Sequence, residues 1–140
     1  MTIFSNYRKT FLLTALICIF LPITVFAGQY QVSRVIDGDT IRVRDGDARL
    51  VIRLVGIDAP EASHGKNEPG QPFSQQATKH LTSLVLGRTV AVKTIGQDRY
   101  GRTLAEVFVD GRNVNLLMVR DGLAEVYRGI PALGQNLDSY

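Results

Sequence analysis

The sequence lacks tryptophan, and its 140 residues include a single cysteine, Cys18. Cys18 lies in an apolar run near the N-terminus, so the chain after that run has no cysteine and needs no disulfide bond in an oxidising compartment. Attachment of a lipid at Cys18 would call for a small residue before it, and that position holds Ile17. The scarcity of cysteine therefore argues against a disulfide framework and against a lipoprotein.

A strong excess of one charge is also absent. The chain has 16 basic and 13 acidic residues, which gives a net charge of +3. Residues 1–27 contain two of the basic residues and none of the acidic ones, so the remaining 113 residues would carry a net charge of only +1. Attraction to nucleic acid must therefore come from the positions of the charges and not from their sum.

The N-terminal segment has the order of a secretory signal. Arg8 and Lys9 precede the apolar run Phe11–Ala27, which ends with small residues at the positions that a signal peptidase reads. We expect residues 1–27 to be removed, leaving a monomeric, secreted or periplasmic protein with no stable membrane association. A retained membrane anchor is the alternative, because the run has about the minimum length that spans a bilayer, although Pro22 interrupts it.

Residues 28–140 contain no linker, repeat or low-complexity tract and are long enough for one domain. Alternation of apolar and polar residues predicts strands separated by polar turns, of which Asp45-Gly46 is typical of a hairpin. The predicted strands are Tyr30–Ile36, Thr40–Arg44, Arg49–Ile57, Thr89–Ile95 and Leu104–Val109. Ala59–Gly70 and Gly96–Thr103 are predicted to be loops.

Two stretches have helical spacing instead. In the first, Pro72 occupies the first turn and Gly87 ends the helix; in the second, Asn113 is the N-cap and Gly122 ends the helix. The apolar faces consist of Phe73, Ala77, Leu81, Leu84 and Val85, and of Val114, Leu117 and Met118. The order of the elements is that of a five-stranded OB-fold barrel, an α+β and mainly β fold with two or three helices, whose face binds oligonucleotides.

Two aspartates flank a glycine in Ile36–Thr40, where the first predicted strand gives way to the second. Alone, this pattern is typical of an ordinary turn. It is not an EF-hand loop, because the fifth position of that pattern holds Ile41 and no glycine follows at the sixth.

A second polar cluster, Arg53–Glu61, spans the end of the third predicted strand. Arg53 stands among hydrophobic strand residues, which is costly for a charge unless a partner satisfies it. Asp58 and Glu61 follow, with Pro60 between them. A structural salt bridge from Arg53 to one of these acids is one explanation, but it does not explain why acids gather at the ends of neighbouring strands.

The third cluster, Asp98–Arg102, holds two arginines, a tyrosine and an aspartate. A solvated hairpin loop is the alternative interpretation of this cluster. His64 and His80 lie outside all three clusters, and we leave both out of the mechanism.

Taken together, the three clusters resemble the staphylococcal thermonuclease family. The resemblance extends from about Val32 to Tyr127. It rests on Ile36–Thr40, Arg53–Glu61, Asp98–Arg102 and Val114–Ala124. It implies a calcium-dependent nuclease that hydrolyses phosphodiester bonds of DNA and RNA with little sequence specificity.

The resemblance also implies roles for single residues. Asp39, Asp58 and the backbone carbonyl of Ala59 correspond to the ligands of Ca²⁺. Ala59 stands where the family's best-known member has threonine, but a carbonyl is all that the metal needs. Glu61 corresponds to the residue that orients or deprotonates the attacking water.

Four further residues are assigned to the substrate by the same resemblance. Arg53 and Arg102 correspond to a pair that clamps the scissile phosphate. Tyr100 corresponds to a phosphate-contacting tyrosine beside that clamp, and Tyr127 to a tyrosine that stacks on the nucleotide.

The chemistry of these residue types fits phosphodiester hydrolysis. Calcium binds several hard oxygens in loose geometry, so two aspartates, a carbonyl and waters suffice. A divalent ion and two guanidiniums stabilise the more negative transition state, and the planar fork of arginine meets two phosphate oxygens at once. A nearby glutamate can act as the base. Because nothing here reads base edges, weak sequence preference follows.

Two other functions remain open at this point. A non-catalytic nucleic-acid-binding OB-fold module is the first, although such a module would usually have lost some of the catalytic set. A membrane-tethered surface protein is the second. At the C-terminus, Gly129–Tyr140 begins like a third helix but is short, so we expect a truncated relative of longer proteins with marginal stability.

Overall fold

Five strands form the body of the protein. The computed structural model describes residues 28–63 and 69–127, and the strands within them alternate buried and exposed side chains as the sequence predicts. The five strands are β1 (Gly28–Val35), β2 (Thr40–Asp45), β3 (Ala48–Leu54), β5 (Thr89–Gln97) and β6 (Thr103–Val109).

The five strands close into a barrel. β1 pairs antiparallel with β2 and β5, β2 pairs antiparallel with β3, and β5 pairs antiparallel with β6. A parallel pairing of β3 with β6 completes the ring, with Arg53 opposite Leu104. The predicted α+β, mainly β fold with an OB-type five-stranded barrel is confirmed.

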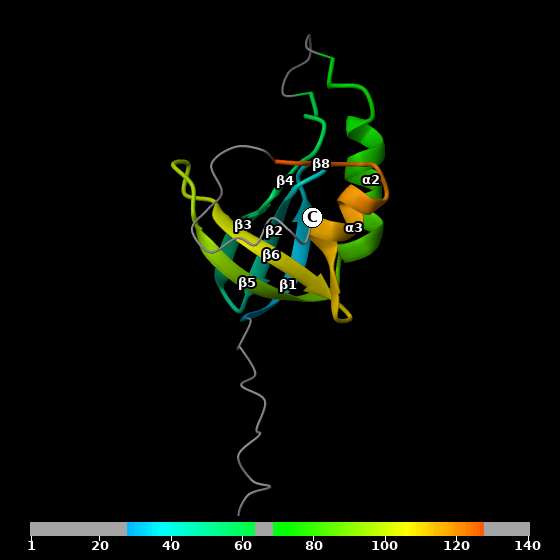
Figure 1. Ribbon diagram of the computed structural model, residues 1–140. Helices are drawn as coiled ribbons and strands as arrows, with labels where there is room; N and C mark the ends of the chain where they lie inside the picture. Colours follow the sequence, from blue (N-terminus) through cyan, green and yellow to red (C-terminus); the bar gives the residue numbers. More distant parts are fainter. Residues whose placement is uncertain (1–27, 64–68, 128–140) are drawn as a thin grey trace, which may run out of the picture.

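Two helices, α2 (Ser74–Val85) and α3 (Val114–Arg120), lie together along one side of the barrel (Figure 1). They bury the predicted residues Ala77, Leu81, Val85, Val114 and Met118 in the same core as the inward side chains of the strands. α3 begins at the predicted cap, because the side chain of Asn113 accepts a hydrogen bond from the backbone N–H of Leu116 at 3.2 Å.

The third predicted strand is shorter than expected. β3 ends at Leu54, because Gly56 adopts a φ of 78° that turns the chain away from β6. The next two residues form a separate strand, β4 (Ile57–Asp58), which pairs with β8 (Glu125–Val126) near the C-terminal end of the described residues. A further short strand, β7 (Arg112–Asn113), pairs with β6.

The loop expected at 96–103 is also shorter than predicted. β5 continues through Gly96 to Gln97, and β6 begins at Thr103, so only residues 98–102 lie between the strands. An irregularity in the register between Thr94 and Gly96 accommodates the glycine within the β5–β6 pairing.

The start of the first helix differs from the prediction. Pro72 and Phe73 precede α2 and are the central residues of a turn in which the Ser74 N–H donates to the carbonyl of Gln71 at 3.1 Å. Phe73 has a φ of 67°, as the third residue of a type II turn requires, and its side chain is 66% exposed. Phe73 is therefore not part of the apolar face that the sequence predicts.

Several expectations concern residues outside the described ranges. The secretory signal at 1–27, His64 and the third helix in 129–140 all lie there. Among the described residues, neither helix has the length and apolar character needed to cross a membrane.

Candidate active site

Asp39 lies at one end of the barrel, at the start of β2. Its side chain is almost completely buried, with 2% exposure for the residue. Its carboxylate accepts hydrogen bonds from the hydroxyl of Thr40 (2.9 Å) and from the backbone N–H of Ala59 (3.0 Å). Burial raises the pKa of Asp39 to about 6, against the lowering effect of the nearby Arg53 guanidinium.

The glycine of the first cluster has a packing role. A side chain at Gly38 would place a Cβ atom 2.7 Å from the Cβ of Ala59 and 2.8 Å from that of Ala77. Only glycine therefore lets the turn before Asp39 lie against both α2 and the Asp58–Ala59 segment. The Asp-Gly-Asp motif is a turn, as the simpler interpretation holds, and this turn also brings Asp39 to Ala59.

Arg53 joins the first two clusters. Its Nη1 lies 2.6 Å from Oδ1 of Asp39, and its Nη2 lies 2.7 Å from Oδ1 of Asp58. The guanidinium thus bridges a buried carboxylate and one whose side chain is 52% exposed. Desolvation opposes the charge of Arg53, but the two aspartates outweigh it and raise its pKa above the ordinary value. The structural salt bridge that was the alternative interpretation of Arg53 is present, and it joins Asp58 to Asp39 of the first cluster.

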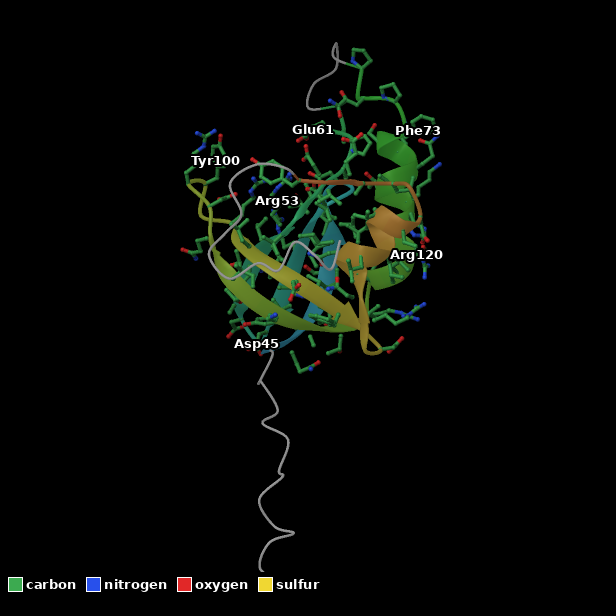
Figure 2. The ribbon with its side chains drawn as sticks, viewed as in Figure 1. Asp45, Arg53, Glu61, Phe73, Tyr100 and Arg120 are labelled. Carbon is green, nitrogen blue, oxygen red and sulfur yellow. The ribbon has the colours of Figure 1, made fainter. Side chains whose placement is uncertain are left out.

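Glu61 follows Asp58 at the same end of the barrel, where Figure 2 shows it above Arg53. Its carboxylate is exposed, while its backbone is fixed by Gln71 through two hydrogen bonds. Gly70 lies against the same segment, since an added Cβ would approach Ser63 N at 2.8 Å and Glu61 O at 3.2 Å. Sequence reasoning did not single out Gln71, because its contact spans the loop between the third strand and the first helix.

The third cluster forms a tight hairpin around Asp98. The Asp98 carboxylate accepts hydrogen bonds from the backbone N–H groups of Tyr100 (2.9 Å) and Arg102 (3.0 Å) and from Nε of Arg102 (2.7 Å). Tyr100 is 68% exposed at the tip of the hairpin, and the guanidiniums of Arg99 and Arg102 lie 4.9 Å and 5.6 Å from its ring centroid. Hydrogen bonds to Asp98 and contacts between the arginines and the Tyr100 ring therefore stabilise this loop, which distinguishes it from a simple solvated hairpin.

The second and third clusters face one groove of about 820 Å³. Arg53 and Glu61 line it from one side, and the hairpin residues Arg102 and Tyr100 line it from the other. Tyr127 also lines the groove and is held there by a hydrogen bond from its N–H to the carbonyl of Gly56 at 2.9 Å. The groove thus collects the five residues that the sequence assigns to catalysis or substrate binding, together with Asp98 and Arg99. The predicted metal ligands Asp39, Asp58 and Ala59 are not among its lining residues.

A buried asparagine supports the base of this groove. The side chain of Asn115, fully buried, accepts from the N–H of Val107 at 3.0 Å and donates to the carbonyls of Val55 (2.8 Å) and Ala105 (3.2 Å). It therefore holds α3, β6 and the end of β3 in one arrangement. Nothing in the sequence pattern indicates this role, because an asparagine inside a helix is usually exposed.

The oxygen donors near Arg53 suit a hard divalent cation. One guanidinium reaches both Asp39 and Asp58, so their two carboxylates lie close to each other. Within the described ranges no cluster of three or more histidine, cysteine or acidic side chains is present. A cation would therefore be held by two carboxylates together with backbone carbonyl and water oxygens, the donor types that calcium accepts.

His80 lies away from this site, in α2. Its Nε2 is 2.9 Å from Oδ2 of Asp121, which follows α3, so the pair links the two helices. His80 does not line the groove, and the structure gives no reason to add it to the mechanism.

Comparison with known protein families identifies a match over most of the chain. The family model described as staphylococcal nuclease homologue matches residues 51–139. The matched segment contains Arg53, Asp58, Glu61 and Arg102, whereas Asp39 lies before its start.

Individual relatives match over a similar part of the chain. An uncharacterized endonuclease of Escherichia coli O157:H7 is 48% identical over 98 residues, which are 69% of this chain and 60% of the relative. An uncharacterized endonuclease of Haemophilus influenzae is 37% identical over 125 residues, 86% of this chain and 66% of the relative. A probable endonuclease of Saccharomyces cerevisiae is 45% identical over 85 residues, 57% of this chain and 31% of the relative. The chain thus spans about two thirds or less of the length of each.

Proposed function

Because the chain belongs to the family of staphylococcal nuclease homologues, we propose that it is a secreted, calcium-dependent nuclease that hydrolyses phosphodiester bonds of DNA and RNA with little sequence specificity. The observation that carries the proposal is the position of Arg53. It contacts Asp39 and Asp58 on one side and lines the groove with Glu61 and Arg102 on the other. The proposed cation ligands and the proposed phosphate-binding groups are therefore connected through one side chain, that of Arg53.

Calcium fits the donor set described above, and Asp39, Asp58 and the carbonyl of Ala59 are the atoms proposed to hold it. When bound, the ion would supply positive charge that offsets the negative charge developing on the phosphate. Relatives named as endonucleases in two bacteria and a yeast support a nuclease activity of this kind.

The two arginines would bind the scissile phosphate in the groove. Both guanidiniums are held by carboxylates, Arg53 by Asp39 and Asp58 and Arg102 by Asp98, so their positions are fixed before the substrate arrives. Fixed donors stabilise a developing charge without reorganisation during the reaction. Arginine also presents two parallel N–H groups to two phosphate oxygens.

Glu61 would accept a proton from the attacking water. Its carboxylate is exposed to the groove and its backbone is held by Gln71, so the base is both accessible and positioned. Tyr100 and Tyr127 present exposed rings to the same groove, where they would contact a phosphate and stack on a base. The contacts proposed here are to phosphate oxygens and to the face of a base, and contacts of these kinds carry little sequence information, which supports weak sequence preference.

The test uses purified protein and labelled single-stranded DNA and RNA. We expect cleavage of both in calcium and no cleavage after a chelator is added. Binding of the nucleic acid without cleavage in calcium would support the alternative, a non-catalytic nucleic-acid-binding OB-fold module, and would reject the nuclease. Full activity in excess chelator would reject the metal assignment alone.

Secretion is tested separately. Expressed in a bacterium, the protein should be found outside the cytoplasm with its N-terminus near Gly28. N-terminal sequencing that finds Met1 on a membrane-bound product would show a retained anchor instead.

A further inference from the structure

Four arginines on the outside of the barrel have no part in the site described so far. Arg42 and Arg44 are two residues apart on β2 and alternate with Ile41 and Val43, which are fully buried, so both arginines face outward. Each of them lies opposite another arginine on one of its two neighbouring strands. We call this surface the arginine face; it consists of Arg34, Arg42, Arg44 and Arg49.

The strand register places like charges directly opposite each other. Arg34 of β1 pairs with Arg42 of β2, and Arg44 of β2 pairs with Arg49 of β3. Like charges at directly opposite positions destabilise a sheet. Among the described residues, none of these four guanidinium groups makes an ion pair. The arrangement therefore costs stability without any compensating contact inside the described part of the chain.

The opposite side of the same barrel is arranged differently. There Lys93 of β5 lies opposite Glu106 of β6, and the two form an ion pair of 2.9 Å. Asp45 and Asp47 lie in the hairpin beyond the arginine face, and neither forms an ion pair with another described residue. The concentration of positive charge is thus local, in a chain whose net charge is only +3.

The arginine face is continuous with the site. On β3, Arg49, Val51 and Arg53 alternate with the inward residues Leu50 and Ile52 and so share the outer surface. The backbone positions of Arg49 and Arg53 are about 13 Å apart along the strand, given the usual rise per residue. Figure 2 shows Arg53 at one end of the barrel and Asp45 at the other, so the arginine face follows the length of the barrel away from the site.

We propose that the arginine face binds the phosphate backbone of a nucleic-acid strand on one side of the scissile bond, so that the protein prefers long strands to short oligonucleotides. This inference rests on the proposed nuclease function and names its substrate class. Guanidinium groups spaced across three adjacent strands match the regular negative charges of a polynucleotide. Contacts to phosphates carry no sequence information, in agreement with the weak specificity proposed above.

The test measures binding without cleavage. In a Glu61→Gln background, fluorescence anisotropy compares labelled oligothymidylates of about 4 and about 16 nucleotides, the range of site sizes for an OB fold. We expect Arg44→Gln/Arg49→Gln to weaken binding of the longer strand by roughly tenfold and to leave the shorter strand little changed. The slope of log K against log salt for the longer strand should fall by about 0.7 for each arginine removed.

A second double variant controls for net charge. Lys79→Gln/Arg112→Gln removes the same two charges from exposed residues of α2 and β7, and it should leave both affinities unchanged. Equal loss in the two double variants, or no loss in Arg44→Gln/Arg49→Gln, would overturn the inference alone. Absence of binding to either length by the parent protein would overturn the proposed substrate as well. Thermal melting of each variant checks that the barrel remains folded.

Discussion

Two hydrogen bonds join Glu61 to Gln71 across the loop between β4 and α2. The Glu61 N–H donates to Oε1 of Gln71 at 2.8 Å, and the Gln71 N–H donates to the carbonyl of Glu61 at 2.9 Å. The Gln71 side chain and the backbone of both residues thus fix the position of the Glu61 backbone, from which the proposed base extends. Gln71 touches neither the proposed metal ligands nor the phosphate-binding arginines, so its effect would pass through the position of Glu61.

Removal of the Gln71 side chain should therefore affect the chemical step. We expect Gln71→Ala to lower kcat by roughly 10–100-fold with little change in KM, because a small displacement of a catalytic group is costly. Gln71→Glu retains an acceptor oxygen and should preserve more of the activity than alanine does. Gln75→Ala, an exposed glutamine of α2, is the matched control. Equal kcat values for Gln71→Ala and the control would show that Gln71 does not position the base.

Substitution of Asp58 should test the proposed metal site with less disturbance of the fold than substitution of Asp39. Its side chain is 52% exposed, whereas Asp39 is buried, so Asp58→Asn should leave the fold intact. Loss of one of two charged ligands should weaken calcium binding by roughly tenfold or more, since affinity follows the number of charged ligands. Isothermal titration calorimetry measures this directly, with Asp47→Asn in the β2–β3 hairpin as the control. An unchanged Kd for Asp58→Asn would remove Asp58 from the proposed ligands.

Arg53 should not be replaceable by lysine. A single ammonium cannot contact Asp39 and Asp58 together and still present a planar fork to a phosphate. We expect Arg53→Lys to reduce turnover by about 10²-fold. The same substitution at Arg49, on the outer face of the same strand, should have little effect on a short substrate. Near-normal turnover in Arg53→Lys would mean that Arg53 has only a structural role.

Asp98 should make stability depend on pH in the acid range. Partial burial tends to raise the pKa of Asp98, but hydrogen bonds from the side chain and N–H of Arg102 and from the Tyr100 N–H outweigh it, and the pKa lies below the ordinary value of 3.8. The charged carboxylate therefore stabilises the folded state above about pH 4, and this contribution is lost as the pH falls through the lowered pKa.

The difference in unfolding free energy between the wild type and Asp98→Asn measures this contribution. It should be constant at neutral pH and shrink as the solution becomes more acidic than about pH 4. Asp45→Asn serves as the control, because the Asp45 carboxylate makes no hydrogen bond or ion pair in the described part of the chain. A difference for Asp98→Asn that does not vary with pH would contradict the assignment.

The sequence predicted the barrel strands well, because alternation of apolar and polar residues is a local pattern. It also indicated that Asp39 and Asp58 converge, because both lie at the ends of neighbouring predicted strands. Alternation around Ile41 and Ile52 identifies the inward faces of β2 and β3. An arginine among apolar strand residues requires a partner, and Arg53 has two. The capping role of Asn113 likewise follows from the three residues after it.

Features that depend on distant pairing could not be predicted in the same way. β4 and β8 are two residues each, and only the pairing of Ile57 with Val126 places Tyr127 beside the groove. The left-handed conformation of Phe73 is one that non-glycine residues rarely adopt, so helical spacing alone misplaces it. The arginine face appears only when the register sets Arg44 opposite Arg49.

The parallel pairing of β3 with β6 determines when the site can form during folding. It joins Ile52 to Thr103 and Arg53 to Leu104, positions far apart along the chain. Contacts of such long sequence separation require closure of a large loop and form slowly. Arg53 lies in this seam and Arg102 immediately precedes it, so a chain with only the β1–β3 meander formed holds Asp39 and Arg53 but lacks the Arg102 half of the phosphate clamp. Closure of the barrel is thus the step that completes the groove.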